Sequence, residues 1–333
     1  MSEIKLLPDY EVKFQQQSIE HLNYNHLLHD IPEKWRITKG ENIKIGILDT
    51  GLPTHKDLEG KVKAYKNFTS DPSELDSDGH STFISGILAG ESKDTNIGII
   101  GIAPKSELYI AKVIGASGGG NDKSLANAIY WCLEQGVDII NMSLGAPASL
   151  ENKFAWTRQA VLAAAERNIF MFAAAGNDGV GSVDVPAKWN EVFAIAAVDN
   201  NQVRATFSNF GPEIDFSGMG VDLVSTYLNN TYSCLSGTSF AGPDIAAIAA
   251  LILSEHKNDK EHQTPINNFM DLRMHLVQLC TDLGDGGWDA NYGWGLVTFG
   301  KPSANLNYKD RYGLVDDQKI IKLPWYKRIF KIF

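Results

Sequence analysis

Short apolar runs alternate along the chain with longer amphipathic stretches. The runs are nearly continuous and rich in β-branched residues, which is typical of strands buried on both faces of a parallel sheet. Two stretches between them, residues 124–135 and 157–167, have the periodicity of helices, and Gly136 is a good C-terminal stop for the first. The runs that we expect to be strands are residues 43–48, 108–113, 137–142, 169–175 and 192–198.

This alternation predicts a doubly wound α/β sandwich, with a central, mostly parallel sheet flanked by helices. Folds of this kind bind ligands at the carboxyl ends of their strands. Residues 1–30 precede the first strand and are mixed and polar, so we interpret them as a short N-terminal arm or pro-segment. Residues 31–305 form the main domain, and residues 306–333 form a basic C-terminal tail.

Composition narrows the class of protein. The 333 residues carry a formal net charge of −10, which argues against a nucleic-acid binder because such proteins need a basic face. The three cysteines form no CxxC pair, so neither a zinc site nor a disulfide framework is indicated. The N-terminus has no apolar run of signal-peptide length, and no stretch of about 18 apolar residues suggests a membrane span. These features together predict a cytoplasmic protein.

Three local segments contain residues whose side chains could take part in catalysis. Asp49 follows a buried strand in ILDTG, His80 lies at the start of a helix in DGHSTFISG, and Ser239 opens an apolar helix in SGTSFAGP. A serine hydroxyl is a weak nucleophile near neutral pH and needs a base, for which histidine has a suitable pKa. The base in turn needs an acid that fixes its tautomer. The three residue types therefore suit nucleophilic catalysis.

A fourth segment, AAAGNDG, places the amide of Asn177 just after a buried strand. Peptide cleavage passes through a tetrahedral oxyanion, and the Asn177 side chain and the Ser239 backbone N–H could both donate to it. The start of the helix at Ser239 also favours negative charge.

Each of these residues also has a simpler interpretation. Asp49 could cap a strand end or bind a metal, and His80 could be a hydrogen-bonded loop histidine. Ser239 could be a helix N-cap, and Asn177 a turn residue beside glycines. Taken singly, the simpler interpretations would hold more often than not, but jointly they are improbable.

The segments ILDTG, DGHST, AAAGN and SGTSFAGP, in this order, resemble the four signature segments of the subtilisin family. The resemblance runs from about residue 35 to 305. It implies a serine endopeptidase whose catalytic triad is Asp49, His80 and Ser239, with Asn177 in the oxyanion hole. It makes the main domain a subtilisin-like catalytic domain and polypeptides its substrates.

The resemblance also implies two edges that hold an extended peptide by backbone hydrogen bonds. Glycine in these edges lets a substrate strand approach closely, although a run of three glycines can equally be a flexible loop. The residues concerned are Gly118, Gly119, Gly120, Ser143, Leu144 and Gly145.

Matching the turn VPA to the family places Asp184 at the floor of the pocket for the residue before the cut. A carboxylate there would favour Lys or Arg at that position (P1) through a charge-assisted pair. A solvated loop acid is the competing interpretation. The family also suggests a structural calcium ion, whose ligands would be Asp57, Thr95, Ile97 and Ile99. The alternative for Asp57 is a helix or turn cap.

Residues 6–10 (LLPDY) resemble the short pro-segment of intracellular subtilisins. We expect the arm to lie across the cleft and to block it until it is removed, with Pro8 resisting cleavage. The competing interpretation is a disordered arm. The basic tail is either a peripheral anchor on an acidic surface or a segment that packs on the domain. A homodimer is left open.

Several positions depart from the family pattern. Phe83 stands where many members have a second histidine, Ser81 where they have glycine, Gly242 where Ser or Thr is usual, and Asp244 where histidine is usual. The leading hypothesis is a protease of intracellular protein turnover made as a zymogen. The alternatives are a processing protease that prefers basic P1 residues and a catalytically impaired peptide-binding protein on the same scaffold.

Overall fold

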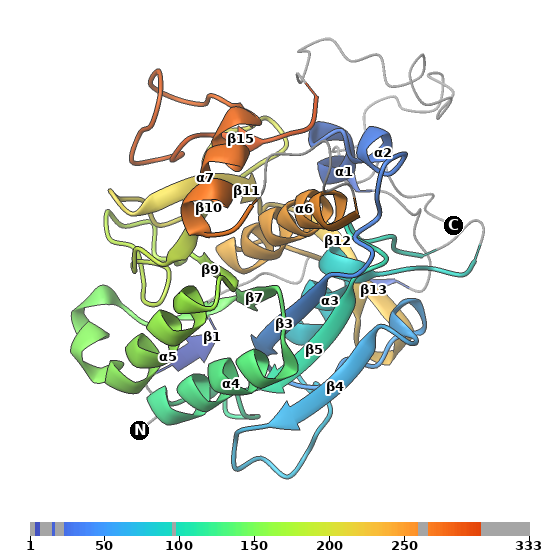
Figure 1. The fold of residues 1–333 in the computed structure, drawn as a ribbon. Helices are drawn as coiled ribbons and strands as arrows, with labels where there is room; N and C mark the ends of the chain where they lie inside the picture. Colours follow the sequence, from blue (N-terminus) through green and yellow to red (C-terminus); the bar gives the residue numbers. More distant parts are fainter. Residues whose placement is uncertain (1–3, 7–14, 17–22, 95–97, 259–265, 301–333) are drawn as a thin grey trace.

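The computed structural model describes residues 4–6, 15–16, 23–94, 98–258 and 266–300. Its centre is a nine-stranded sheet in the order β14-β15-β11-β10-β9-β7-β3-β5-β4 (Figure 1). All neighbours from β4 to β15 are parallel, and only β14 is antiparallel to its neighbour. The strands are β3 (Lys44–Asp49), β4 (Val62–Asn67), β5 (Glu107–Lys112), β7 (Ile139–Met142), β9 (Phe170–Ala174), β10 (Val192–Val198), β11 (Ile214–Met219), β14 (Cys280–Thr281) and β15 (Leu296–Val297).

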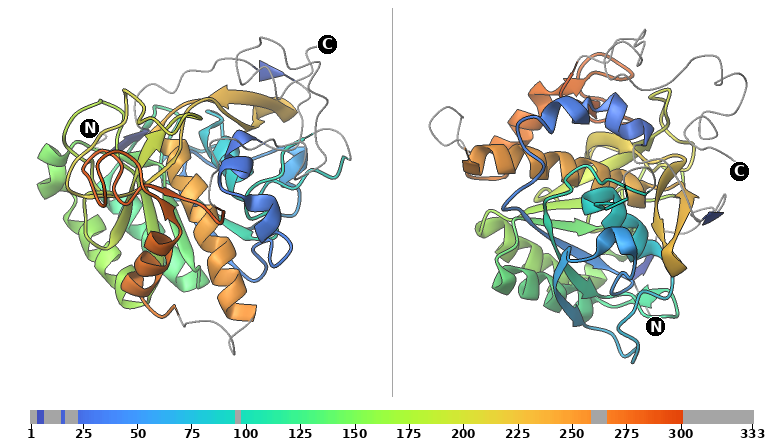
Figure 2. Two further views of the ribbon diagram at one scale, coloured as in Figure 1. Left: turned by 90° about the horizontal axis from the view of Figure 1, so that it is seen from above. Right: turned by 90° about the vertical axis from the view of Figure 1, so that its right-hand side faces the viewer.

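Helices cover both faces of this sheet (Figure 2). One face carries α3 (His80–Ala89), α6 (Thr238–Asn258) and α7 (Phe269–Gln278), and the other carries α4 (Asp122–Gln135) and α5 (Ala155–Glu166). Ile45 and Ile47 of β3 face the first layer, whereas Leu48 faces the second. Strands that are apolar on both faces explain the continuous apolar runs of the sequence. The predicted doubly wound α/β sandwich is confirmed.

The strand order reverses at β3. The chain places β5 on one side of β3 and β7 on the other, so the carboxyl ends of these three strands meet at a topological switch point. Two short edge strands follow there: β6 (Gly119–Gly120) after β5, and β8 (Leu144–Gly145) after β7. This is the position at which folds of this class bind ligands.

The first described segment of the chain lies between these two edges. β1 (Ile4–Leu6) pairs antiparallel with β6 on one side and with β8 on the other. A second short strand, β2 (Gln15–Gln16), pairs with β13 (Thr231–Leu235), which forms a hairpin with β12 (Leu223–Tyr227). The N-terminal segment thus contributes one strand to each of two small sheets.

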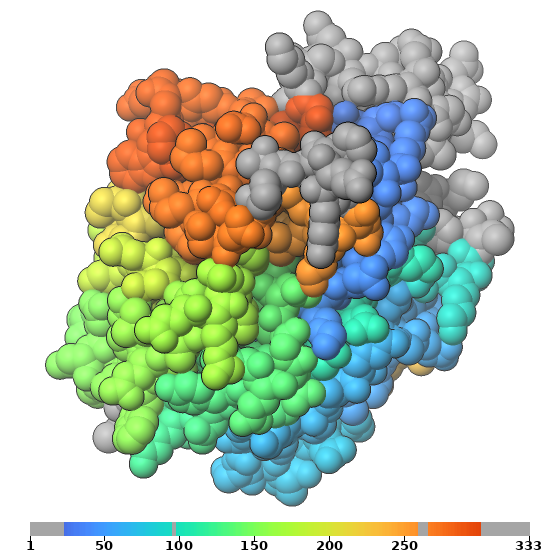
Figure 3. Space-filling view, viewed as in Figure 1, coloured from blue at the N-terminus to red at the C-terminus, as the bar shows by residue number. Residues whose placement is uncertain are grey.

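Residues 23–35 pack on the domain as α1 (Tyr24–Leu28) and α2 (Ile31–Lys34). Figure 3 shows this blue segment beside the orange C-terminal part of the chain. Two bonds join them: Phe299 N–H donates to the His29 carbonyl (3.0 Å), and the Thr298 hydroxyl donates to the Leu28 carbonyl (3.0 Å). The boundary at residue 30 stays a prediction, and the basic tail of residues 306–333 lies outside the described residues.

Within the described parts of the chain, one helix is long and apolar enough to span a membrane by length and composition. This helix is α6, and 94% of the apolar stretch is buried inside the protein. Its apolar character is therefore accounted for by its place in the core.

Candidate active site

Asp49 is the last residue of β3 and is fully buried. Its two carboxylate oxygens lie 2.9 and 3.0 Å from Nδ1 of His80, and the Thr50 N–H donates to Oδ1 (2.8 Å). The chain turns away sharply at Gly51, whose φ is 146°. A Cβ at this position would lie 2.8 Å from the Leu75 carbonyl, so the turn needs glycine.

His80 is the first residue of α3 and is also fully buried. Its ring packs against Phe240 with a centroid separation of 5.5 Å, and Phe240 packs against Phe83 at 4.6 Å. The aromatic side chain of Phe83, where a second histidine is usual, therefore packs against Phe240, the residue that contacts the His80 ring. This departure from the family pattern is a packing change.

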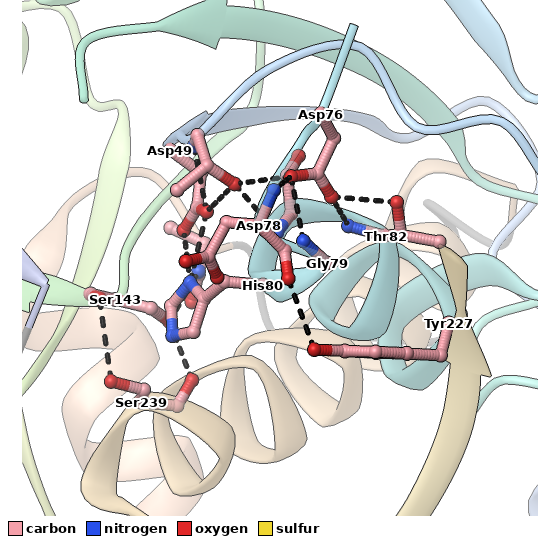
Figure 4. Close-up of polar contacts among 12 residues, drawn as sticks. Asp49, Asp76, Asp78, Gly79, His80, Thr82, Ser143, Tyr227 and Ser239 are labelled. Atoms are coloured by element: carbon pink, nitrogen blue, oxygen red, sulfur yellow. Dashed lines mark hydrogen bonds and ion pairs between the residues drawn. The ribbon is translucent and has the colours of Figure 1, made fainter. Parts of the chain in front are cut away.

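Ser239 is the second residue of α6. Its hydroxyl lies 3.3 Å from the Ser143 carbonyl oxygen. Figure 4 shows the His80 ring between the Asp49 carboxylate and the Ser239 side chain, with the ring edge opposite Asp49 directed at Ser239. The three predicted residues, which come from β3, α3 and α6, thus meet in one row.

Several charges act on the His80 imidazole. Burial, the largest single influence, lowers the pKa of His80. The charge of Asp49, its hydrogen bond, and the charges of Asp78 and Asp76 oppose burial and outweigh it, so the net effect raises the pKa of His80. The site is built to stabilise an imidazolium.

The Asn177 side chain is held from one end. Its Oδ1 accepts hydrogen bonds from the Thr238 N–H (2.9 Å) and the Thr238 hydroxyl (2.7 Å). The acceptor end of the amide is therefore tied to the first residue of α6, next to Ser239. This orientation makes the amide NH₂ the end that can donate to a reacting group.

The two predicted substrate edges are the strands that pair with β1. Lys5 lies opposite both Gly119 and Gly145, Ile4 lies opposite Gly120, and Leu6 lies opposite Leu144. Gly118 precedes β6 and has a φ of 74°.

Ser143 ties the β8 edge to the nucleophile helix, because its hydroxyl donates to the Ser239 carbonyl (2.6 Å). The edge that would carry substrate is therefore fixed relative to Ser239.

Asp184 lies next to the end of the β8 edge. The following residue, Val185, exchanges two backbone hydrogen bonds with Ala146, at 3.0 and 2.9 Å. The Asp184 side chain is buried, and burial, helped by the charge of Asp178, raises its pKa to about 7. Among the described residues no cation pairs with it.

The predicted calcium ligands are only partly described. Asp57 is buried, and its Oδ2 accepts hydrogen bonds from the Tyr232 hydroxyl (2.9 Å) and the Ile99 N–H (2.8 Å). Thr95 and Ile97 lie outside the described residues. One carboxylate and the Ile99 carbonyl fall short of the about six to eight oxygens that calcium takes. No three His, Cys, Asp or Glu side chains gather as a metal site in the described part of the chain.

The environment of Asp244 differs from anything expected from the sequence. This residue of α6 is fully buried, and its carboxylate lies 2.7 Å from Nε2 of His29. It also accepts from the Asn25 amide (2.8 Å) and from the Met219 N–H (2.8 Å). The one signal in the sequence was an acid at a position where the family usually has histidine.

Comparison with known proteins shows the family of this chain. Residues 40–295 match the model of the subtilase family, peptidase family S8. The chain is 38% identical to subtilisin Savinase from Lederbergia lenta and 39% identical to subtilisin DY from Bacillus licheniformis, over 78% of this chain and 89% and 90% of those proteins. It is 38% identical to M-protease from Shouchella clausii (strain KSM-K16), of which it spans 63%.

The fold and the site together define a serine endopeptidase of the subtilisin type. The chain belongs to the subtilase family.

Proposed function

We propose that this chain hydrolyses peptide bonds through the triad Asp49, His80 and Ser239. Ser239 attacks the peptide carbonyl as His80 takes its proton, which gives a tetrahedral oxyanion. His80 then donates this proton to the amine nitrogen as the C–N bond breaks, which releases the amine and leaves the acyl-enzyme. Water then attacks the acyl-enzyme in the same way. Asp49 holds the imidazole in one tautomer and stabilises its charged form. The observation that carries the proposal is the His80 ring placed between Asp49 and Ser239 (Figure 4).

The oxyanion would be held by Asn177 and by the start of α6. The Ser239 backbone N–H lies in the first turn of α6, where the helix dipole and unpaired N–H groups favour negative charge. Asn177 is oriented by Thr238, the neighbouring residue. Both donors are thus fixed to the element that carries the nucleophile, which is the preorganisation that this step needs.

We further propose that the chain is made as a zymogen. The proposal is supported by β1, which pairs with both of the edges that are predicted to hold a substrate strand. From Lys5 to Leu6 of β1, the paired residue of β8 changes from Gly145 to Leu144. The arm therefore advances along β8 toward Ser143, whose carbonyl oxygen contacts the Ser239 hydroxyl. The next residues, Leu7 and Pro8, lie outside the described residues. An arm bound in this way would exclude substrate until it is displaced or removed.

The substrate range follows from the P1 pocket. General intracellular protein turnover is the leading form of the proposal. The alternative is a processing protease that cuts after Lys or Arg. It is favoured by the buried carboxyl of Asp184 beside β8, which pairs with no cation among the described residues. A basic P1 side chain would supply the missing cation.

A calcium ion at Asp57 and the loop of residues 93–99 is proposed as a stabilising ligand with no part in the chemistry. Melting with and without millimolar calcium tests it, because a ligand of the native state raises the melting temperature. No calcium effect, or an equal effect in Asp57→Asn, would refute this site.

We also propose a cytoplasmic location. It is supported by Cys132, Cys234 and Cys280, none of which forms a disulfide. Cell fractionation would test it. The homodimer and the contact of the basic tail stay predictions.

Cleavage of a peptide library tests the proposed activity directly. We expect cleavage by the wild type that is absent in Ser239→Ala, and the residues preceding the cuts report the P1 preference. A wild-type protein that binds peptides but does not cleave them would favour the impaired, peptide-binding alternative.

A further inference from the structure

A second buried acid lies beside the triad. Asp76 is 4% exposed, and its carboxylate accepts five hydrogen bonds from three neighbouring parts of the chain (Figure 4). In the described part of the chain all of its donors are neutral, and no Lys, Arg or His forms an ion pair with it. A buried carboxylate with this many donors is held in one orientation.

One of these bonds reaches the acid of the triad. The Thr50 hydroxyl lies 2.9 Å from Oδ1 of Asp76 and 3.1 Å from Oδ1 of Asp49. It also accepts a hydrogen bond from the Ser81 N–H (3.1 Å). The single hydroxyl proton of Thr50 is therefore shared between the two carboxylates, and the Thr50 oxygen contacts the residue after His80.

The other four bonds hold the helix that begins at His80. Oδ1 accepts from the Asp78 N–H (3.1 Å) and the Gly79 N–H (2.9 Å), which immediately precede His80. Oδ2 accepts from the Thr82 N–H (2.8 Å) and the Thr82 hydroxyl (2.6 Å). The first turn of α3 is thus tied to one carboxylate from both sides of His80.

The backbone of Asp76 is itself fixed to the strand end that carries Asp49. Its N–H donates to the Leu52 carbonyl (2.9 Å), and Leu52 N–H donates to the Glu74 carbonyl (2.9 Å). The nearby cation Lys112 pairs with Asp71 (3.0 Å) and donates to the Leu75 carbonyl (3.2 Å). The Asp76 carboxylate is therefore anchored to β3 and bound to α3.

We propose that Asp76 is a positioning residue, which sets the His80 imidazole against Asp49 by clamping the end of β3 to the first turn of α3. The inference rests on the proposed triad. Its physical basis is that the Asp49 and His80 side chains come from different elements, and Asp76 bonds to residues adjacent to both. A displacement of about 1 Å in such an arrangement can cost about 100-fold in rate.

The competing interpretation is that Asp76 only stabilises the loop of residues 71–79. The two interpretations differ in what happens at each folded active site. A loop-stabilising acid changes the folded fraction, whereas a positioning residue lowers kcat per folded site and leaves KM nearly unchanged.

The main test compares Asp76→Asn with wild type, in the full chain and in parallel in a form lacking residues 1–20. Folded protein is measured by thermal melting and active sites by titration. We expect kcat per folded site to fall about 100-fold, with KM within about two-fold. The lost negative charge should also move the acidic limb of kcat/KM to lower pH, because the charges of Asp49, Asp78 and Asp76 together raise the pKa of His80.

Asp78→Asn is the matched control for charge. It removes another carboxylate that acts on His80, but it keeps the Asp76 bonds. We expect its acidic limb to shift in the same direction with a much smaller loss of kcat. Substrates for both variants carry neutral residues on either side of the cut, so that subsite charge does not enter.

Thr50→Val decides the question if Asp76→Asn does not fold. It removes the bridging hydroxyl and keeps the side-chain shape, and we expect kcat to fall about ten-fold with KM unchanged. Unchanged kcat per folded site in Asp76→Asn, or in Thr50→Val where the first does not fold, would overturn the proposal. A wild type that cleaves no substrate would instead refute the proposed function.

Discussion

At the scale of single residues, the buried carboxyl group of Asp184 is predicted to affect which P1 residue the protein prefers. Burial raises the pKa of Asp184 to about 7, so its carboxyl becomes fully ionised only above neutral pH. A Lys or Arg side chain at P1 would favour the ionised form and bind better as the acid ionises. An apolar P1 side chain would gain nothing from this ionisation.

We therefore predict that the ratio of kcat/KM for Lys to kcat/KM for Leu at P1 rises as pH increases from about 6 to 8. Paired peptide substrates that differ only at P1 measure it. Asp184→Asn should remove the pH dependence of this ratio, while the dependence common to both substrates, which reports His80, remains. A ratio that is flat in the wild type would make Asp184 a loop acid.

Gly242 leaves a buried acceptor without a partner. Oδ1 of Asn141 is buried and accepts no hydrogen bond in the described part of the structure. A Cβ at Gly242 would lie 3.5 Å from this oxygen and 3.9 Å from its next neighbours, which is ordinary contact. The site has room for the small hydroxyl side chain that is usual here.

Gly242→Ser should therefore stabilise the protein by about 1 kcal/mol, because it removes a glycine from a helix and supplies a donor. Gly242→Ala should recover only the part that comes from the helix. Urea unfolding in a Ser239→Ala background avoids self-digestion during the measurement. A serine variant no more stable than the alanine variant would show that Asn141 gains no bond.

At the scale of elements, the link between α1 and the nucleophile helix is the least expected contact. Asp244 of α6 and His29, just after α1, are 215 positions apart in the sequence and both fully buried. Nδ1 of His29 also lies 2.5 Å from the Val297 carbonyl. Leaving a buried carboxylate without its main partner strongly lowers the stability of the folded state. This pair therefore fixes residues 23–30 to the helix that carries Ser239.

We predict that His29→Leu lowers the free energy of unfolding by about 3 kcal/mol or more. The double variant His29→Leu, Asp244→Leu should lose less than the sum of the two single variants, since no charge is left buried alone. His26→Leu, on the same helix, is the control and should cost less. Strictly additive single effects, measured by urea unfolding, would show that the pair is not coupled.

At the scale of the whole molecule, the arm and the switch point explain how one chain could hold its own active site closed. β1 uses the same two edges that we assign to substrate. Removing residues 1–20 leaves the Asn25 and His29 bonds to Asp244 in place, so the domain should keep its fold.

The form lacking residues 1–20 should therefore cleave a short peptide about ten-fold faster or more than the full chain, in line with a strand bound by 1.4 kcal/mol or more. Lys5→Pro in the full chain should act in the same direction, because proline removes the N–H at the centre of β1. A synthetic peptide of residues 1–12 should inhibit the shortened form. Equal rates for the long and short forms would refute the blocking role.

The parts of this architecture that could be predicted from sequence are those with a local signal. Buried parallel strands appear in the sequence as apolar runs, and Gly136 marks the end of α4. Asp49 lies at the end of a strand, and His80 and Ser239 lie in the first turns of helices. The meeting of three elements at the carboxyl ends of the strands then follows from the topology.

The remaining contacts have no local signal. The Asp244–His29 pair, the pairing of β1 with two edges and the bond between Thr50 and Asp76 all depend on segments that only the folded chain brings together. Short, polar segments such as residues 71–79 carry no periodicity from which their contacts could be inferred. The sequence shows that Asp76 is an acid near His80, but not which donors surround it.

The measurement that tests the central claim most directly is labelling with a fluorophosphonate, which reacts with an activated serine. The form lacking residues 1–20 is treated, digested and examined by mass spectrometry, beside His80→Ala as a control with the same serine. The account predicts one adduct, on the peptide that contains Ser239, and its loss in His80→Ala. A folded protein that gains no adduct, or gains it on another serine, would contradict the proposed triad.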